Sequence, residues 1–174
     1  HCSGAADLLR VAVSAHQDEE RGVRSSGGVL RATACKLTGG RVAVQCEGTS
    51  AAALHKITTD SVQSGVKALG NSAVKVTSSK IEGSFRGALV ADDATLITED
   101  TTISGGSDGV HVYDRGLLVA GGRIFAKEIG VTATDSARVV LGNAAVEAEV
   151  VGVSAKGRAV VRVVSGTVAA PECL

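Results

Sequence analysis

The amino-acid sequence predicts an all-β protein whose chain winds in parallel coils of 21 to 22 residues. Three observations lead to this fold class. Small and apolar residues recur at a fixed step, short alternations of apolar and polar residues lie between them, and few aromatic side chains are present to fill a wide core. A fixed period of this length indicates units that stack, each covering the open face of the next. We therefore expect a rod and not a layered globule.

The clearest repeat is a small residue followed by Val or Ala. It recurs at steps of 21 or 22 residues as Gly22-Val23, Ala43-Val44, Gly65-Val66, Gly87-Ala88, Gly109-Val110, Gly130-Val131 and Gly152-Val153. A second column holds Ile81, Ile103, Ile124, Val146 and Val168, each followed two places later by Gly or Ala. A third column holds Ala73, Ala94, Gly116, Ala137 and Ala159. Three columns that keep one step indicate a structural repeat.

One unit, residues 65–86, shows how a coil is built. The runs GVKAL, AVKV and KIEG alternate apolar and polar residues, which is the pattern of a half-buried strand. The segments GNS, TSS and SFR between and after them are rich in turn-forming residues. Each coil is therefore expected to contain three short strands and three corners.

Strands that pair with their equivalents in the next coil make a parallel β-helix. Helical repeats need two helices of about ten residues per unit, and the segment KVTSSKIEGSFRG, rich in Gly and β-branched residues, does not supply them. The Leu and Asn pattern of leucine-rich repeats is missing, and left-handed hexapeptide helices have shorter, regular sides. The spacing favours a right-handed parallel β-helix, or β-solenoid, of seven or eight coils.

We expect one domain over residues 1–174. Residues 1–21 form an N-terminal strand, LLRVAVSA, and a charged turn, and residues 22–64 form irregular early coils. Residues 65–170 form the regular coils and 171–174 a tail. The columns blur over residues 47–64, where SAAALHKI is a candidate for a short helix or a bulged coil.

The composition limits the classes of partner. Apolar residues make up 44% of the chain, but the aromatics are only Phe85, Tyr113 and Phe125, so the core must be thin and aliphatic. The 18 basic and 18 acidic residues balance, which argues against nucleic acid or anionic lipid as a partner. No apolar run reaches the roughly 20 residues of a membrane-spanning helix, so we expect no membrane insertion.

Residues 22–170 resemble the right-handed parallel β-helix class, which includes pectate lyases, adhesins and tail spikes. The resemblance covers the repeat architecture and includes no family-specific motif. It implies a glycan- or host-surface-binding module as an alternative function, and a polysaccharide lyase or hydrolase as a weaker one. Lyases carry long loops that wall a groove, whereas these coils follow one another with almost no insertions. We therefore expect no enzymatic activity.

A polar ladder is expected at the first corner of each coil. Asn71, Asp92, Asp114 and Asp135 follow at steps of 21, 22 and 21. Asn and Asp satisfy backbone N–H groups in turns and tolerate left-handed backbone angles, so we expect them to serve the corners. Stacked carboxylates can also bind calcium, which is the one candidate cofactor. No other metal or cofactor is expected.

Four cysteines, Cys2, Cys35, Cys46 and Cys173, are candidates for disulfides because no C-x-x-C pair is present. Cys35 and Cys46, eleven residues apart, can staple the early coils. Cys2 and Cys173 are 171 residues apart, close to eight coils, so they lie at similar positions on opposite ends of the rod and can pair between rods. Alternatively, Cys2 pairs with Cys35 or Cys46 while Cys173 stays free, or a mobile N-terminal tail crosses to another coil.

The ends of the rod point to the leading functional hypothesis. A parallel solenoid exposes unpaired backbone groups at each end, and neither the first strand nor the last apolar segment, AVVRVVSGTVAAPECL, shows a polar cap. End-to-end contacts that do not close make filaments. We expect an extracellular structural protein that stacks head to tail with copies of itself into a filament or surface appendage. The even cysteine count and a chain that begins with His suggest a mature, secreted form.

Overall fold

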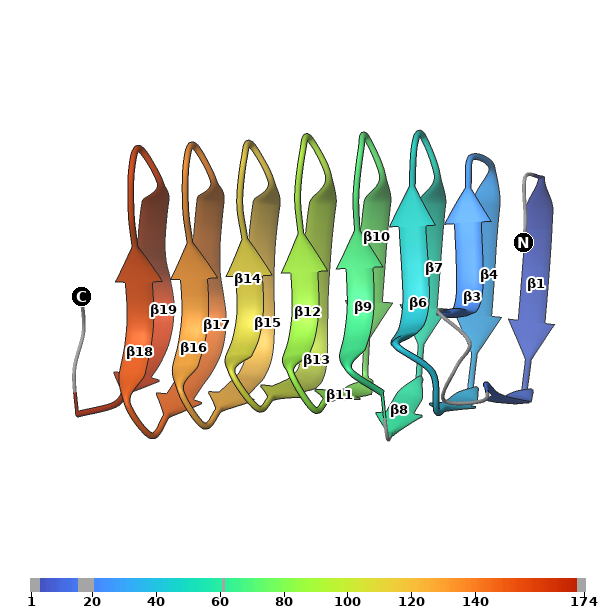
Figure 1. The fold of residues 1–174 in the computed structure, drawn as a ribbon, viewed down its shortest axis with the longest axis horizontal. Helices are drawn as coiled ribbons and strands as arrows, with labels where there is room; N and C mark the ends of the chain where they lie inside the picture. Colours follow the sequence, from blue (N-terminus) through green and yellow to red (C-terminus); the bar gives the residue numbers. More distant parts are fainter. Residues whose placement is uncertain (1–3, 16–20, 61, 172–174) are drawn as a thin grey trace.

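The computed structural model describes residues 4–15, 21–60 and 62–171, and over these ranges the regular structure consists of parallel β-strands without a helix (Figure 1). Consequently no described segment has the helical length and apolarity needed to cross a membrane. The strands are β1 (Ala5–Leu9), β2 (Ala12–Ser14), β3 (Arg21–Ser26), β4 (Val29–Thr33), β5 (Lys36–Thr38), β6 (Val42–Glu47), β7 (Ala51–His55), β8 (Thr58–Asp60), β9 (Ser64–Ala68), β10 (Ala73–Thr77), β11 (Lys80–Gly83), β12 (Arg86–Val90), β13 (Thr95–Gly105), β14 (Asp108–Val112), β15 (Leu117–Ala126), β16 (Ile129–Ala133), β17 (Arg138–Ala148), β18 (Val151–Ala155) and β19 (Val160–Ala169).

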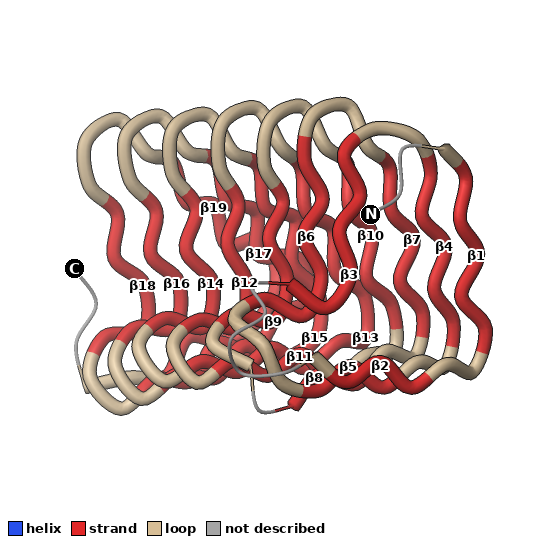
Figure 2. The backbone as a smooth tube through the Cα atoms, turned by 45° about the vertical axis from the view of Figure 1, so that its right-hand side comes forward, coloured by secondary structure: helices blue, strands red, loops and turns tan. Residues whose placement is uncertain are grey.

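The strands form a parallel β-solenoid of about seven coils, which confirms the predicted fold class. One sheet holds seven strands in the order β18-β16-β14-β12-β9-β6-β3, one strand from each coil. The other sheet holds twelve strands and wraps two walls of the rod. In Figure 1 the nearer strands run upward and the farther strands downward while the chain advances from right to left, so the winding is right-handed. Figure 2 shows the corners stacked in rows along the rod.

The expected three strands per coil hold for the first four coils and change afterwards. From β13 onward, the first two strands of a coil join into one strand of ten or eleven residues that bends around the corner. A single residue with a left-handed backbone makes the bend, for example Ser78 (φ 49°) between β10 and β11 and Asp100 (φ 47°) within β13. Pairing resumes beyond this residue with a small shift in register. The corner is thus alike in early and late coils, and only the continuity of pairing differs.

The core consists of inward-facing columns that run along the rod. Val44, Val66, Ala88, Val110 and Val131 pair in succession, and each is at most 1% exposed. Ile81, Ile103, Ile124 and Val146 form the second predicted column, also buried. In the third predicted column the first residue is wrong by one position. Ala73 pairs with Thr95 and faces solvent, and the buried residue equivalent to Ala94 in the preceding coil is Ser72.

The repeated glycine has a direct structural cause. A β-carbon built on Gly65, Gly87 or Gly109 would lie 2.3, 2.4 or 2.5 Å from the Cγ2 atom of Ile81, Ile103 or Ile124. Real Cβ contacts are longer than 3.0 Å, and buried atoms cannot be moved without strain. The Gly-Val column and the Ile column are therefore two halves of one packing contact.

One early segment, for which a short helix or a bulged coil was expected, is a regularly paired strand. Residues 51–55 form β7, paired in register with β4 and β10, and not a helix or a bulge. Alternation buries Ala52 and Leu54, and pairing on both edges overrides the helix propensity of the alanine run. The expected first strand, residues 8–15, is split into β1 and β2 by Arg10, whose φ is 52°. Of the expected charged turn, residues 16–20 lie outside the described residues.

Candidate functional site

The aspartates expected at the first corner lie in one row. Asp92, Asp114 and Asp135 adopt φ values of 58°, 56° and 62°, which few residues other than Gly, Asn and Asp accept. Backbone hydrogen bonds place Gly48, Gly70 and Gly157 at the same position in other coils. Asn71 does not belong to this row and lies one residue further along the coil. Its N–H donates to the O atom of Gly48, a member of the row, and the N–H of Asp93 donates in the same way to the O atom of Gly70. Asn71 and Asp93 therefore occupy equivalent positions, directly after the row.

The carboxylates at this corner make local contacts. Asp92 Oδ2 accepts a hydrogen bond from the N–H of Gly70 at 2.8 Å, and Asp135 Oδ2 accepts one from Thr134 Oγ1 at 3.1 Å. Arg115 donates to both carboxylate oxygens of Asp93 at 2.6 and 2.5 Å, and these hydrogen bonds lower the pKa of Asp93. Within the described residues, no three His, Cys, Asp or Glu side chains gather as metal ligands would. Calcium at this row stays a prediction.

The two described cysteines do not form the expected staple. Cys35 and Cys46 are both buried and both free thiols. Half a coil separates them, so Cys35 lies at the corner between β4 and β5 whereas Cys46 lies on β6, between Ser25 and Ala68. Burial raises the pKa of the Cys46 thiol to about 12. The pairings expected for Cys2 and Cys173 fall on residues that lie outside the described ranges.

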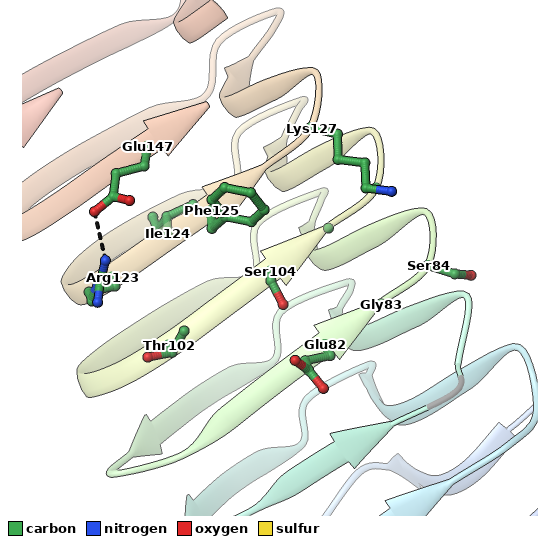
Figure 3. A pocket seen from close by; sticks show the side chains of 12 residues that line it. Glu82, Gly83, Ser84, Thr102, Ser104, Arg123, Ile124, Phe125, Lys127 and Glu147 are labelled. Atoms are coloured by element: carbon green, nitrogen blue, oxygen red, sulfur yellow. Dashed lines mark hydrogen bonds and ion pairs between the residues drawn. The ribbon is translucent and has the colours of Figure 1, made fainter. Parts of the chain in front are cut away.

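A shallow hollow of about 530 Å³ lies on the wall formed by β11 and the ends of β13, β15 and β17 (Figure 3). Glu82, Ser104, Phe125 and Glu147 pair in succession on neighbouring strands of this wall. The ring of Phe125 is 40% exposed. Arg123 donates to Glu147 Oε1 at 2.8 Å beside the ring. Thr102, Ser84 and Lys127 also line the hollow. The hollow thus combines an aromatic surface with donors and acceptors from neighbouring coils.

Sequence reasoning missed this hollow because it used the three aromatic residues only as evidence for a thin core. Tyr113 is half-buried and packs edge-on against His111, with ring centroids 5.6 Å apart. Phe85 and Phe125 are the exposed rings, at 49% and 40%. The signal was present, since a residue next to inward-facing Ile124 in a strand must point outward.

A buried polar cluster lies on the outer side of the seven-stranded sheet. Asp108 is 5% exposed and accepts hydrogen bonds from Arg86 Nε at 3.1 Å and Thr132 Oγ1 at 2.6 Å. His111 Nδ1 lies 3.6 Å from Asp108 Oδ2. Burial alone would raise the pKa of Asp108, but the contacts with His111, Thr132 and Arg86 outweigh it and lower the pKa. The guanidinium of Arg86 also lies 4.6 Å above the ring of Phe85. These contacts tie three coils together.

The two ends of the described rod leave the core partly open. At the first coil, the inward residues Ala6, Leu8 and Val13 are only partly buried. At the last coil, Val161 and Val168 are partly buried, and Val163 is 50% exposed. Within the described ranges β1 pairs only with β4, and β19 pairs only with β17. Each end therefore presents a strand edge together with apolar side chains.

The chain has no match among protein-family models and no significant match among curated proteins or solved structures. The β-solenoid fold therefore stands on the strand pairing and the columns described above.

Proposed function

We propose that this protein is a secreted structural subunit that stacks head to tail with copies of itself into an extracellular filament or surface appendage. The observation that carries the proposal is the match between the two open ends. Both ends present parallel strand edges, and both present partly buried aliphatic side chains at equivalent positions of the coil. The extracellular location is proposed from the sequence alone, since Cys35 and Cys46 do not form a disulfide.

The equivalence of the ends follows from the register of the coils. Successive pairings connect Leu8 to Val163 through one inward column: Leu8, Ala32, Leu54, Val76, Thr98, Ala120, Leu141 and Val163. A second copy that continued the solenoid would place its Leu8 over Val163 and its Ala6 over Val161. Between β19 of one copy and β1 of the next, the contact would then reproduce the packing between neighbouring coils of the rod.

Two physical terms favour this contact. Unpaired N–H and C=O groups on β1 and β19 would pair with each other, as edge strands do when another strand is offered. Apolar surface on Leu8, Val161 and Val163 would leave water, at about 25 cal/mol for each Å² buried. The two surfaces are different, so the contact is heterologous and can continue without closing. A filament is the expected product.

The test is the size of the assembled 174-residue protein as its concentration rises. Light scattering and electron microscopy should show rods that lengthen with concentration. Val163→Lys places a charge on the open end of β19 and should leave monomers with an unchanged circular dichroism spectrum. Val119→Lys, the same substitution on the side of the rod, is the matched control and should still assemble. A wild-type protein that stays strictly monomeric at high concentration would contradict the proposal.

A second candidate function is binding of a glycan or host surface, and the hollow around Phe125 is the observation that favours it. An exposed ring flanked by Arg123, Ser104 and Thr102 offers an apolar surface with directed polar groups, the combination found in ligand sites. A panel of oligosaccharides can be screened for binding by calorimetry. Phe125→Ala should abolish any binding found and Phe85→Ala should not.

The prediction that the chain is not an enzyme stays a prediction.

A further inference from the structure

We propose that the head-to-tail stack is held in a single register by an ion pair between Asp7 of one copy and Arg162 of the next. This inference rests on the proposed function, since it names the contact that the stacked ends would make. It adds the polarity and the register of the filament, which aliphatic contacts alone leave open because they are not directional.

Asp7 and Arg162 occupy the same outward position of the coil. The pairings connect them through one column: Asp7, Arg31, Ala53, Lys75, Ile97, Val119, Val140 and Arg162. Both side chains are exposed. Continuing the solenoid by one coil into a second copy places the carboxylate of its Asp7 next to Arg162, on strands about 4.8 Å apart.

Neighbouring coils within the rod are already joined by this kind of pair. Arg31 lies 3.8 Å from Asp7 in the same column, Arg86 lies 3.1 Å from Asp108, and Arg115 lies 2.5 Å from Asp93, each pair spanning two coils. An ion pair between Arg162 and Asp7 would repeat this arrangement of Arg–Asp pairs at the boundary between two copies. Asp7 would then lie between Arg31 of its own chain and Arg162 of the other copy.

The charges also select the polarity of the stack. Residues 151–171 contain Lys156, Arg158 and Arg162 and no acidic residue. Two copies meeting through their last coils would therefore bring like charges together, which opposes association.

Reversing each charge separately tests the pair. Asp7→Arg and Arg162→Asp should each raise the concentration at which half of the protein is assembled by about tenfold, because attraction becomes repulsion. An equimolar mixture of the two variants should assemble nearly as well as wild type, since every contact in an alternating stack then joins opposite charges. Arg138→Asp, a charge reversal on the side of β17, is the matched control and should have no effect.

A second pair of variants covers the case in which a reversed charge disturbs the terminal strand. Asp7→Asn and Arg162→Gln should each reduce the dependence of assembly on salt concentration, because the screened interaction is gone. Assembly that is indifferent to all four substitutions, or singles that weaken assembly without rescue in the mixture, would overturn the proposed register while leaving filament formation intact. Absence of assembly by the wild-type protein would instead overturn the proposed function itself.

Discussion

A β-carbon placed on Gly109 would lie 2.5 Å from the Cγ2 atom of Ile124, fifteen residues further along the chain. The γ-methyl of Ile124 occupies the space that a side chain on Gly109 would need. The same relationship joins Gly130 to Val146, whose Cγ1 would lie 2.4 Å from the added atom. The regular recurrence of glycine is thus a consequence of the β-branched residue that packs beside it in each coil.

Gly109→Ala should destabilise the protein by about 1 to 3 kcal/mol, the usual cost of overpacking a rigid core. Gly142→Ala is the matched control, because a β-carbon there meets no atom within 4 Å and the backbone is not left-handed. Urea unfolding followed by circular dichroism measures both. Equal midpoints for the two variants would show that the Gly–Ile contact is not tight.

Asp92→Val should cost about 1 to 2 kcal/mol, because a β-branched residue is strained at a φ of 58°. Asp92→Gly should cost less, since Gly occupies the same corner position at residues 48, 70 and 157. The loss remaining in the glycine variant would reflect the hydrogen bond from the N–H of Gly70 to the carboxylate. The order of the two melting temperatures is the measurement, and a valine variant as stable as the glycine variant contradicts the corner argument.

Asp108 should make stability depend on pH in the acid range. Its pKa is lowered in the folded state, so its contribution is present above the unfolded value of about 3.9 and is lost as pH falls through the folded value. Asp108→Asn should cost about 1 to 3 kcal/mol at pH 7, because Arg86 and Thr132 lose their charged partner. The difference from wild type should shrink below pH 3. Urea unfolding at both pH values tests this, and a constant difference contradicts it.

Cys46 should be unreactive in the native protein. Its thiol is buried and its pKa is raised to about 12, so almost no thiolate exists near neutral pH. In a variant with Cys2 and Cys173 replaced by Ala, a thiol reagent should label neither Cys35 nor Cys46 until denaturant is added. Rapid labelling of the folded variant at pH 8 would show that the thiols are accessible.

Much of the fold could be predicted because the repeat is a property of the chain itself. Val66, Val110 and Val131 recur at a step that only stacked coils explain, and their burial follows from strand alternation. The exposed position of Phe125 could have been predicted in the same way, from its place beside Ile124. The free state of Cys35 and Cys46 could not, because sequence spacing does not say which wall of the coil each thiol faces.

The sequence by itself determined the period, the thin aliphatic core and the turn chemistry of the corners, because these depend on residues within one or two coils of each other. Only the tertiary structure decided which residues are neighbours across coils. Ala73 and Asn71 are each one residue away from the columns to which spacing assigns them. Asp7 of the first coil pairs with Arg31 of the second, 24 residues later and not 21 or 22. The register between coils is set by backbone pairing after each corner, and corners differ in length. The shared position of Asp7 and Arg162 is therefore visible only once every pairing along the rod is known.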